Sequence, residues 1–135
     1  MFDVEQNTPN HLKIGQIGEN MVTQRLLKEG HHIVERNYLK PYGEIDIVTS
    51  KDQILHFVEV KALSGDVPRG TSQAFLPQDH MNYGKQQRQK RVIETYLAER
   101  KVGEQADWQI DLACVYLDRE GKLIELEFSE DITLA

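Results

Sequence analysis

The chain has 135 residues, the size of one domain, and its 39% hydrophobic and 28% charged residues are typical of a globular protein. No apolar run approaches the ~20 residues of a membrane span, and the acidic, polar opening MFDVEQNTPNH contains no secretory signal pattern. A net charge of −6 argues against a general nucleic-acid coat protein but is compatible with a local basic patch. The single cysteine, Cys114, cannot form an internal disulfide, so we expect a cytoplasmic protein with no membrane partner.

Seven elements are predicted in the order α-β-β-β-α-β-β, over residues 14–29, 31–39, 44–49, 54–62, 83–101, 108–117 and 122–128. Apolar residues at helical spacing define the two helices, and β-branched or aromatic runs define the strands. The run 108–117 is largely apolar, as in a central strand buried on both faces, whereas 122–128 alternates like an edge strand. This order predicts an α/β fold with a central mixed sheet flanked by helices.

Two segments lie outside these elements. Residues 1–11 are expected to form a flexible lead-in, and residues 12–135 a single domain. Residues 63–82 contain two prolines and two glycines and show little periodicity. A loop of this length inside a compact domain is either functional or a flap without chemistry, and the sequence leaves both interpretations open.

The predicted hairpin GEIDIVTSKDQILHFVEVK carries four charged residues: Glu44, Asp46, Glu59 and Lys61. Carboxylates are poor strand formers and are costly to bury, so a purely structural hairpin has little use for them. Because side chains alternate along a strand, the first two share one face of their strand and the last two share one face of theirs. The same alternation predicts that Ile45 and Ile47 lie together on the opposite face.

The loop length determines which residues face each other across this hairpin. A loop over Ser50–Gln53 sets Asp46 opposite Phe57 and Glu44 opposite Glu59. A register shifted by two residues would keep the same faces. Asp46 then lies diagonal to Glu59, with about 7–8 Å between the backbones, so the charged side chains form one patch.

This patch predicts a divalent metal site with a lysine beside it. Asp46 and Glu59 repel each other, which raises their pKa values, and a divalent cation relieves the repulsion. Mg²⁺ and Mn²⁺ favour one or two carboxylates together with water and substrate phosphate. Lys61 would orient or deprotonate a water, or hold a phosphate oxygen, as phosphodiester hydrolysis requires. The alternative is a solvated edge hairpin with an ordinary cross-strand Glu–Lys pair.

Further acidic residues are candidate ligands of the same site. Glu19 lies on the helical stripe that faces the sheet, so it is either a further metal ligand or a glutamate favoured by the helix dipole. Glu44 is either a further ligand or a solvated neighbour. The five histidines show none of the spacing typical of zinc ligands.

The second helix carries a basic strip in which Lys85, Arg88 and Arg91 follow one another at steps of three. The strip is predicted either to contact a nucleic-acid backbone or to remain a solvated face. Lys85 begins the helix, where exposed backbone N–H groups also favour phosphate.

The strand pair resembles the PD-(D/E)XK, or restriction-endonuclease-like, superfamily, in which an acid on one strand and Glu-x-Lys on the next hold metal and carry out hydrolysis. More closely, the chain resembles the YraN-like family of bacterial proteins. The resemblance rests on GQIGENMVTQRLLKEGHHIVERNY (15–38), GEIDIV (43–48), FVEVK (57–61) and KQQRQKRVIETYL (85–97). It implies that Asp46 matches the metal-binding acid, that Glu59 and Lys61 match the Glu-x-Lys, and that Glu19 matches an acid on the first helix.

The sequence and the resemblance together predict a restriction-endonuclease-like core that acts as a Mg²⁺- or Mn²⁺-dependent nuclease on DNA or structured nucleic acid. Asp46, Glu59 and Lys61 are its predicted catalytic residues. The alternative is a non-catalytic nucleic-acid-binding or scaffolding module that keeps the same fold.

Overall fold

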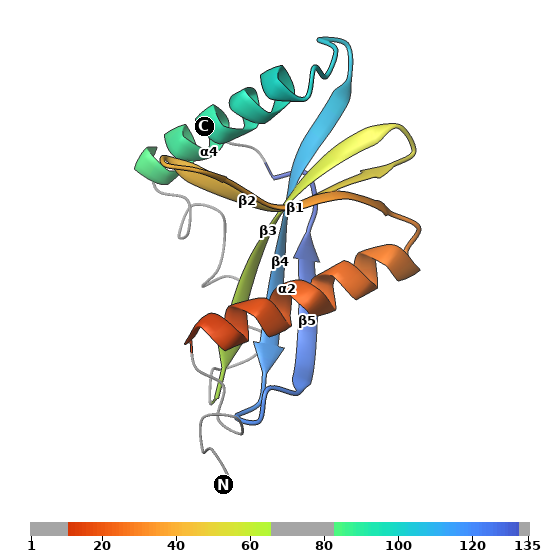
Figure 1. The fold of residues 1–135 in the computed structure, drawn as a ribbon. Helices are drawn as coiled ribbons and strands as arrows, with labels where there is room; N and C mark the ends of the chain where they lie inside the picture. Colours follow the sequence, from red (N-terminus) through yellow and green to blue (C-terminus); the bar gives the residue numbers. More distant parts are fainter. Residues whose placement is uncertain (1–10, 66–82, 133–135) are drawn as a thin grey trace, which may run out of the picture.

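The computed structural model describes residues 11–65 and 83–132. Its elements, labelled as in Figure 1, are α2 His11–Lys28, β1 His32–Lys40, β2 Gly43–Lys51, β3 Ile54–Ser64, α4 Tyr83–Glu99, β4 Asp107–Leu117 and β5 Leu123–Ser129. The predicted order α-β-β-β-α-β-β is confirmed. The proposed lead-in, apart from its last residue, and residues 66–82 of the predicted loop lie outside the described residues.

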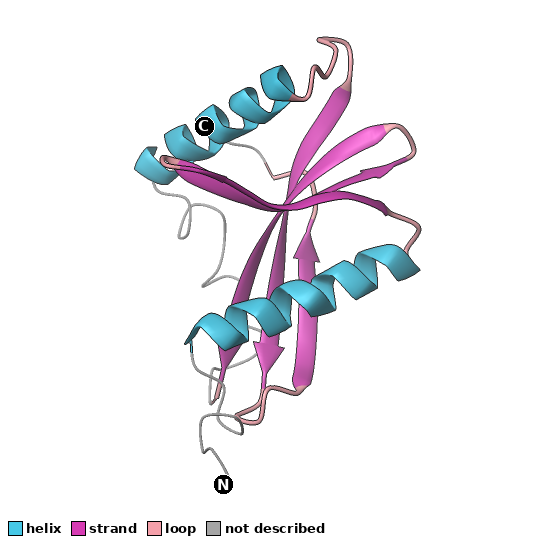
Figure 2. Cartoon of the chain, in the orientation of Figure 1, coloured by secondary structure: helices cyan, strands magenta, loops and turns pink. Residues whose placement is uncertain are grey.

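The five strands form one mixed sheet in the order β1-β2-β3-β4-β5 (Figure 2). Neighbouring strands are antiparallel except β3 and β4, which are parallel. The chain between these two strands contains α4, because a parallel pair needs a crossover rather than a hairpin. β4 is buried from Ile110 to Leu117, and β5 forms an edge of the sheet, as predicted.

The two helices cover opposite faces of the sheet. Val22 and Leu26 of α2 pack in a core cluster with Val58, whereas Val92 of α4 packs in a second cluster with Phe57. Phe57 and Val58 are successive residues of β3, so they point to opposite faces. Figure 1 shows β1 and β2 passing between the two helices. Within the described residues, no helix combines the length and apolar character that a membrane crossing requires.

Two glycines determine where α2 lies and where it ends. A Cβ atom on Gly18 would lie 2.7 Å from the Cβ of Ala62, so the absence of a side chain lets the helix approach β3 closely. Gly30 has φ of 92°, and the N–H of His31 donates to the carbonyl oxygen of Leu26 at 2.9 Å. This is the helix end that the sequence predicted at Gly30.

The β2–β3 hairpin has a shorter loop than predicted. Only Asp52 and Gln53 lie between the strands, with φ values of 51° and 67°, as the two-residue turns of twisted hairpins require. The predicted four-residue loop is therefore wrong, and the register moves by two residues. Phe57 faces Val48, not Asp46. A shift of two residues does not by itself move any side chain to the other face.

The alternation along β2 breaks at Asp46. Ile45 packs in the cluster beneath α4 and Ile47 in the cluster beneath α2, so the prediction that they share a face is wrong. The opposite strand explains the break. Asn37 has φ of 56°, a left-handed backbone, and the β1–β2 register skips the pair of Asn37 and Asp46. A kink in β1 and β2 therefore turns this part of the sheet.

Candidate active site

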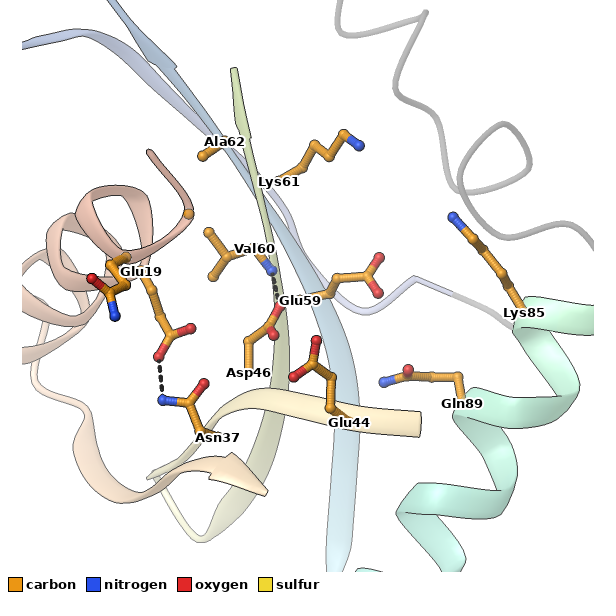
Figure 3. A pocket seen from close by; sticks show the side chains of 12 residues that line it. Glu19, Asn37, Glu44, Asp46, Glu59, Val60, Lys61, Ala62, Lys85 and Gln89 are labelled. Carbon is orange, nitrogen blue, oxygen red and sulfur yellow. Dashed lines mark hydrogen bonds between the residues drawn. The ribbon is translucent and has the colours of Figure 1, made fainter. Parts of the chain in front are cut away.

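An open pocket of about 430 Å³ lies where β2 and β3 stop pairing, beyond Ile47 and Val58. Residues from both helices reach it, because the gap between the strands is open to both layers. In Figure 3, Glu19 enters from α2 on one side and Lys85 from α4 on the other, with the strand carboxylates between them. The charged residues that line the pocket are Glu19, Glu44, Asp46, Glu59, Lys61 and Lys85.

Asp46 lies at the centre of this pocket. One of its oxygens, Oδ2, accepts the backbone N–H of Val60 at 2.8 Å, in the position where a β2 carbonyl would otherwise pair (Figure 3). Burial raises the pKa of Asp46 to about 7, and the hydrogen bond from Val60 opposes this shift. The carboxylates of Glu44, Glu59 and Glu19 raise the pKa further. At neutral pH this carboxyl group is therefore poised between its two protonation states.

Glu59 is another partly buried carboxyl group of the pocket. Burial raises its pKa, while the ammonium groups of Lys85 and Lys61 lower it and the charge of Glu44 raises it. The site thus contains a pair of acids whose ionised forms are incompletely compensated, with two lysines near one of them. Additional positive charge would stabilise the ionised pair.

The oxygen donors of the pocket are carboxylates, the ligand type that magnesium and manganese prefer. Among the described residues, no three histidine, cysteine, aspartate or glutamate side chains meet closely enough to enclose a metal ion. Structural and catalytic zinc sites need three or four such ligands. Mg²⁺ requires only one or two carboxylates, because water and substrate phosphate complete its shell. Asp46 and Glu59 are the two carboxylates of the pocket that could hold such a cation.

Glu19, a candidate ligand from the sequence, has partners that the sequence did not predict. Its Oε1 accepts the Nε–H and Nη2–H of Arg36 at 3.0 and 2.8 Å and the amide of Asn37 at 3.0 Å. The Glu19 side chain is only 13% exposed. One oxygen of Glu19 is therefore already occupied, and the guanidinium of Arg36 compensates its charge.

The structure divides the predicted basic strip of α4. Lys85 and Arg88 line a hollow of about 270 Å³ beside Glu59 and Glu44, which adjoins the main pocket. The guanidinium of Arg91 instead stacks 3.7 Å from the ring centre of Tyr42. Two members of the strip therefore lie at the site, and the third packs on an aromatic ring beside it.

Three polar residues of the pocket were missed in the sequence: Gln16, Asn37 and Gln89. Gln89 is 8% exposed and lines both hollows. Its spacing of four from Lys85 places the two on one side of the helix, a signal that could have indicated it. Asn37 lines the pocket from β1. Asparagine tolerates a left-handed backbone better than most residues, and this was the only feature of the strand-like run that could have indicated Asn37.

The fold and the pocket define an α/β protein with a carboxylate and lysine site at a split in its sheet. Residues 18–117 match the family model described as Uncharacterised protein family UPF0102. The chain belongs to this family, which confirms the resemblance drawn from its motifs.

Relatives in the family match over nearly their whole length. The chain is 37% identical over 110 residues to a UPF0102 protein of Alkaliphilus metalliredigens, covering 82% of this chain and 90% of the relative. It is 32% identical over 119 residues to one of Dictyoglomus thermophilum, covering 88% and 95%. A UPF0102 protein of Campylobacter jejuni is 34% identical over 119 residues, covering 88% and 92%. The sequence matches therefore span most of this chain and of each relative.

Proposed function

We propose that this chain is a Mg²⁺- or Mn²⁺-dependent nuclease that hydrolyses phosphodiester bonds of DNA or structured nucleic acid. The observation that carries the proposal is the presence of Asp46, Glu59 and Lys61 in one pocket. The resemblance of the two strands to the restriction-endonuclease-like superfamily supports it. Family membership adds no support of its own, since the family description states no activity.

Each residue has a distinct role in this proposal. Asp46 and Glu59 hold the divalent cation, and the hydrogen bond from Val60 keeps the Asp46 carboxylate oriented. When bound, the cation supplies positive charge that stabilises the charge developing on the phosphate oxygens. Lys61 orients or deprotonates the attacking water, or holds a phosphate oxygen. Lys85, with Arg88, binds the backbone beside the scissile phosphate.

Metal binding is the first part of the test. Mn²⁺ or Mg²⁺ should raise the melting temperature of the wild type, because a ligand of the folded state stabilises it. The Asp46→Asn variant should show a much smaller shift at the same metal concentration. Equal shifts in both proteins would remove the metal site and, with it, the proposed chemistry.

Cleavage is the second part, measured on single-stranded, duplex, flapped and junction DNA and on hairpin RNA with each metal. Lys61→Ala should lower the cleavage rate at least about 100-fold with little loss of binding, because its contact is made in the transition state. Lys85→Ala should weaken binding and lower the salt slope by about one unit. Lys122→Ala is the matched control, because Lys122 is an exposed lysine that lines neither the main pocket nor the adjoining hollow. It should change neither the cleavage rate nor the binding.

The second candidate function has a defined outcome in the same panel. Wild type that binds several substrates but cuts none with either metal is a nucleic-acid-binding module that keeps the fold. The net charge of −6 favours the scaffolding form of this alternative, since the pocket has few cations to hold a polyanion without metal. Wild type that neither binds nor cuts leaves only the scaffolding role.

A further inference from the structure

Asn37 has an unusual backbone conformation at the edge of the pocket. Its φ of 56° lies in the left-handed region, although it is an interior residue of β1. Residues with a Cβ atom rarely adopt this region, and Asn tolerates it better than most. Such a conformation persists only where the surrounding structure holds it, so it calls for a physical reason.

The conformation of Asn37 coincides with a change in how Asp46 is paired. In a regular antiparallel ladder these two residues would face each other, but the β1–β2 register skips them. The pairing of β2 with β3 ends at Ile47 and Val58, one residue short of Asp46. Asp46 thus takes no part in either ladder, and its carboxylate instead accepts the N–H of Val60 across the gap.

The side chain of Asn37 makes a second link. Its amide donates to Oε1 of Glu19 at 3.0 Å (Figure 3). The guanidinium of Arg36 binds the same oxygen. β1 is thereby joined to α2 beside Asp46. This link fixes where the Glu19 carboxylate lies at the edge of the pocket.

We propose that Asn37 is a positioning residue for the Asp46 carboxylate. Its left-handed backbone takes Asp46 out of the β1–β2 ladder, which lets the carboxylate reach the gap and the N–H of Val60. Its amide fixes Glu19 on the other side of the pocket. The value of this arrangement for metal binding rests on the proposed function, whereas the arrangement itself can be tested without metal.

The test compares Asn37→Gly with Asn37→Ala in the metal-free protein. Both variants lose the amide, but only alanine carries a Cβ that disfavours positive φ. The readout is the exchange rate of the Val60 amide hydrogen, measured by NMR, with Asp46→Ala as the reference for complete loss of the acceptor. We expect exchange at least about fivefold faster in Asn37→Ala than in Asn37→Gly, with glycine restoring most of the wild-type protection.

Controls separate positioning from a general loss of stability. The amide of Ile110, in the buried part of β4, should exchange at the same relative rate in both Asn37 variants once global unfolding is taken into account. Asn20→Ala also removes a hydrogen bond of Arg36 but leaves the Glu19 link in place, so Val60 exchange should stay within about twofold of the wild type. Equal Val60 exchange in the two Asn37 variants would overturn the proposal.

If Asn37→Ala does not fold, Asn37→Gly alone tests the positioning role of Asn37. Val60 exchange as fast in Asn37→Gly as in Asp46→Ala would show that backbone freedom at residue 37 does not hold the carboxylate. Mn²⁺ titration of the same variants separates this inference from the proposed function. The expected order of Val60 exchange, together with equal Mn²⁺ shifts in wild type and Asp46→Asn, would keep the positioning role and reject the metal site.

Discussion

Asp46 accepts one hydrogen bond and lies near three other carboxylates. The sequence predicted mutual repulsion of acids on one face of the hairpin. In the structure, burial is the larger cause of the raised pKa, and the neighbouring charges come second. Sequence patterns could place the acids together, but the depth of the pocket depends on the packing of two helices against the sheet.

The raised pKa makes the stability of the metal-free protein depend on pH. Folding favours the protonated form of Asp46, so stability should fall as pH rises from about 4, where an unfolded aspartate ionises, to about 7, its pKa in the folded protein. Asp46→Asn removes this ionisation. Its free energy of unfolding should match that of wild type near pH 4 and exceed it by about 2–4 kcal/mol at pH 8, as measured by urea denaturation.

An exposed aspartate provides the control for this series. Asp107→Asn, at the start of β4, should change the free energy of unfolding by less than about 0.5 kcal/mol at every pH. A pH-independent gain in Asp46→Asn would show that some effect other than ionisation stabilises the variant. A loss of stability at pH 8 would identify Asp46 as a structural partner instead.

For the β2–β3 hairpin, the sequence predicted the faces of some side chains but not the register or the break at Asp46. Its period of two correctly placed Glu59 and Lys61 on one face. The predicted register was wrong by two residues because Asp52 and Gln53 form the turn by themselves. Asp-Gln is not one of the pairs typical of such turns, which are Asn-Gly and Asp-Gly. The break at Asp46 was also missed, since its cause lies on the neighbouring strand, at Asn37.

The contact of α2 with β3 predicts opposite effects for two glycines of one helix. Alanine normally stabilises a helix interior by up to about 1 kcal/mol relative to glycine. Gly15→Ala should show such a gain, because a Cβ there meets no atom within 4 Å. Gly18→Ala should instead destabilise by about 1–3 kcal/mol, because its Cβ would lie 2.7 Å from that of Ala62.

Urea denaturation of the two alanine variants checks this prediction. Similar stability changes in both would mean that α2 does not depend on a close approach at Gly18. The rise in melting temperature caused by Mn²⁺ adds a functional readout, since Glu19 follows Gly18 directly in the helix. A helix displaced from Ala62 should carry the link between Glu19 and Arg36 with it.

For the whole molecule, the sequence predicted the element order and the mixed sheet, because hydrophobic periodicity is a local property. The composition of the pocket was only partly predictable. The link of Arg36 to Glu19 and the position of Gln89 arise where side chains from helices on opposite faces meet at a gap in the sheet. Such meetings depend on how the layers pack, and no spacing within one element records them.

The parallel pairing of β3 with β4 has a consequence for the order of folding. β1, β2 and β3 are joined by short turns, whereas β4 pairs with β3 only after a long crossover. Closing a long connection is slower than closing a hairpin, so the three-stranded meander is expected to form first and β4 to dock late. Asp46 and Glu59 would then be brought together early, while water still solvates them and before the core buries them.

Two fully buried valines test this order. Val48 lies in β2 and Val115 in β4, and each is 0% exposed. In stopped-flow measurements, Val48→Ala should mainly slow folding, while Val115→Ala should mainly speed unfolding and leave the folding rate within about twofold of the wild type. The reverse pattern would mean that the chain begins to fold around the parallel pair, and that the two acids meet only as folding is completed.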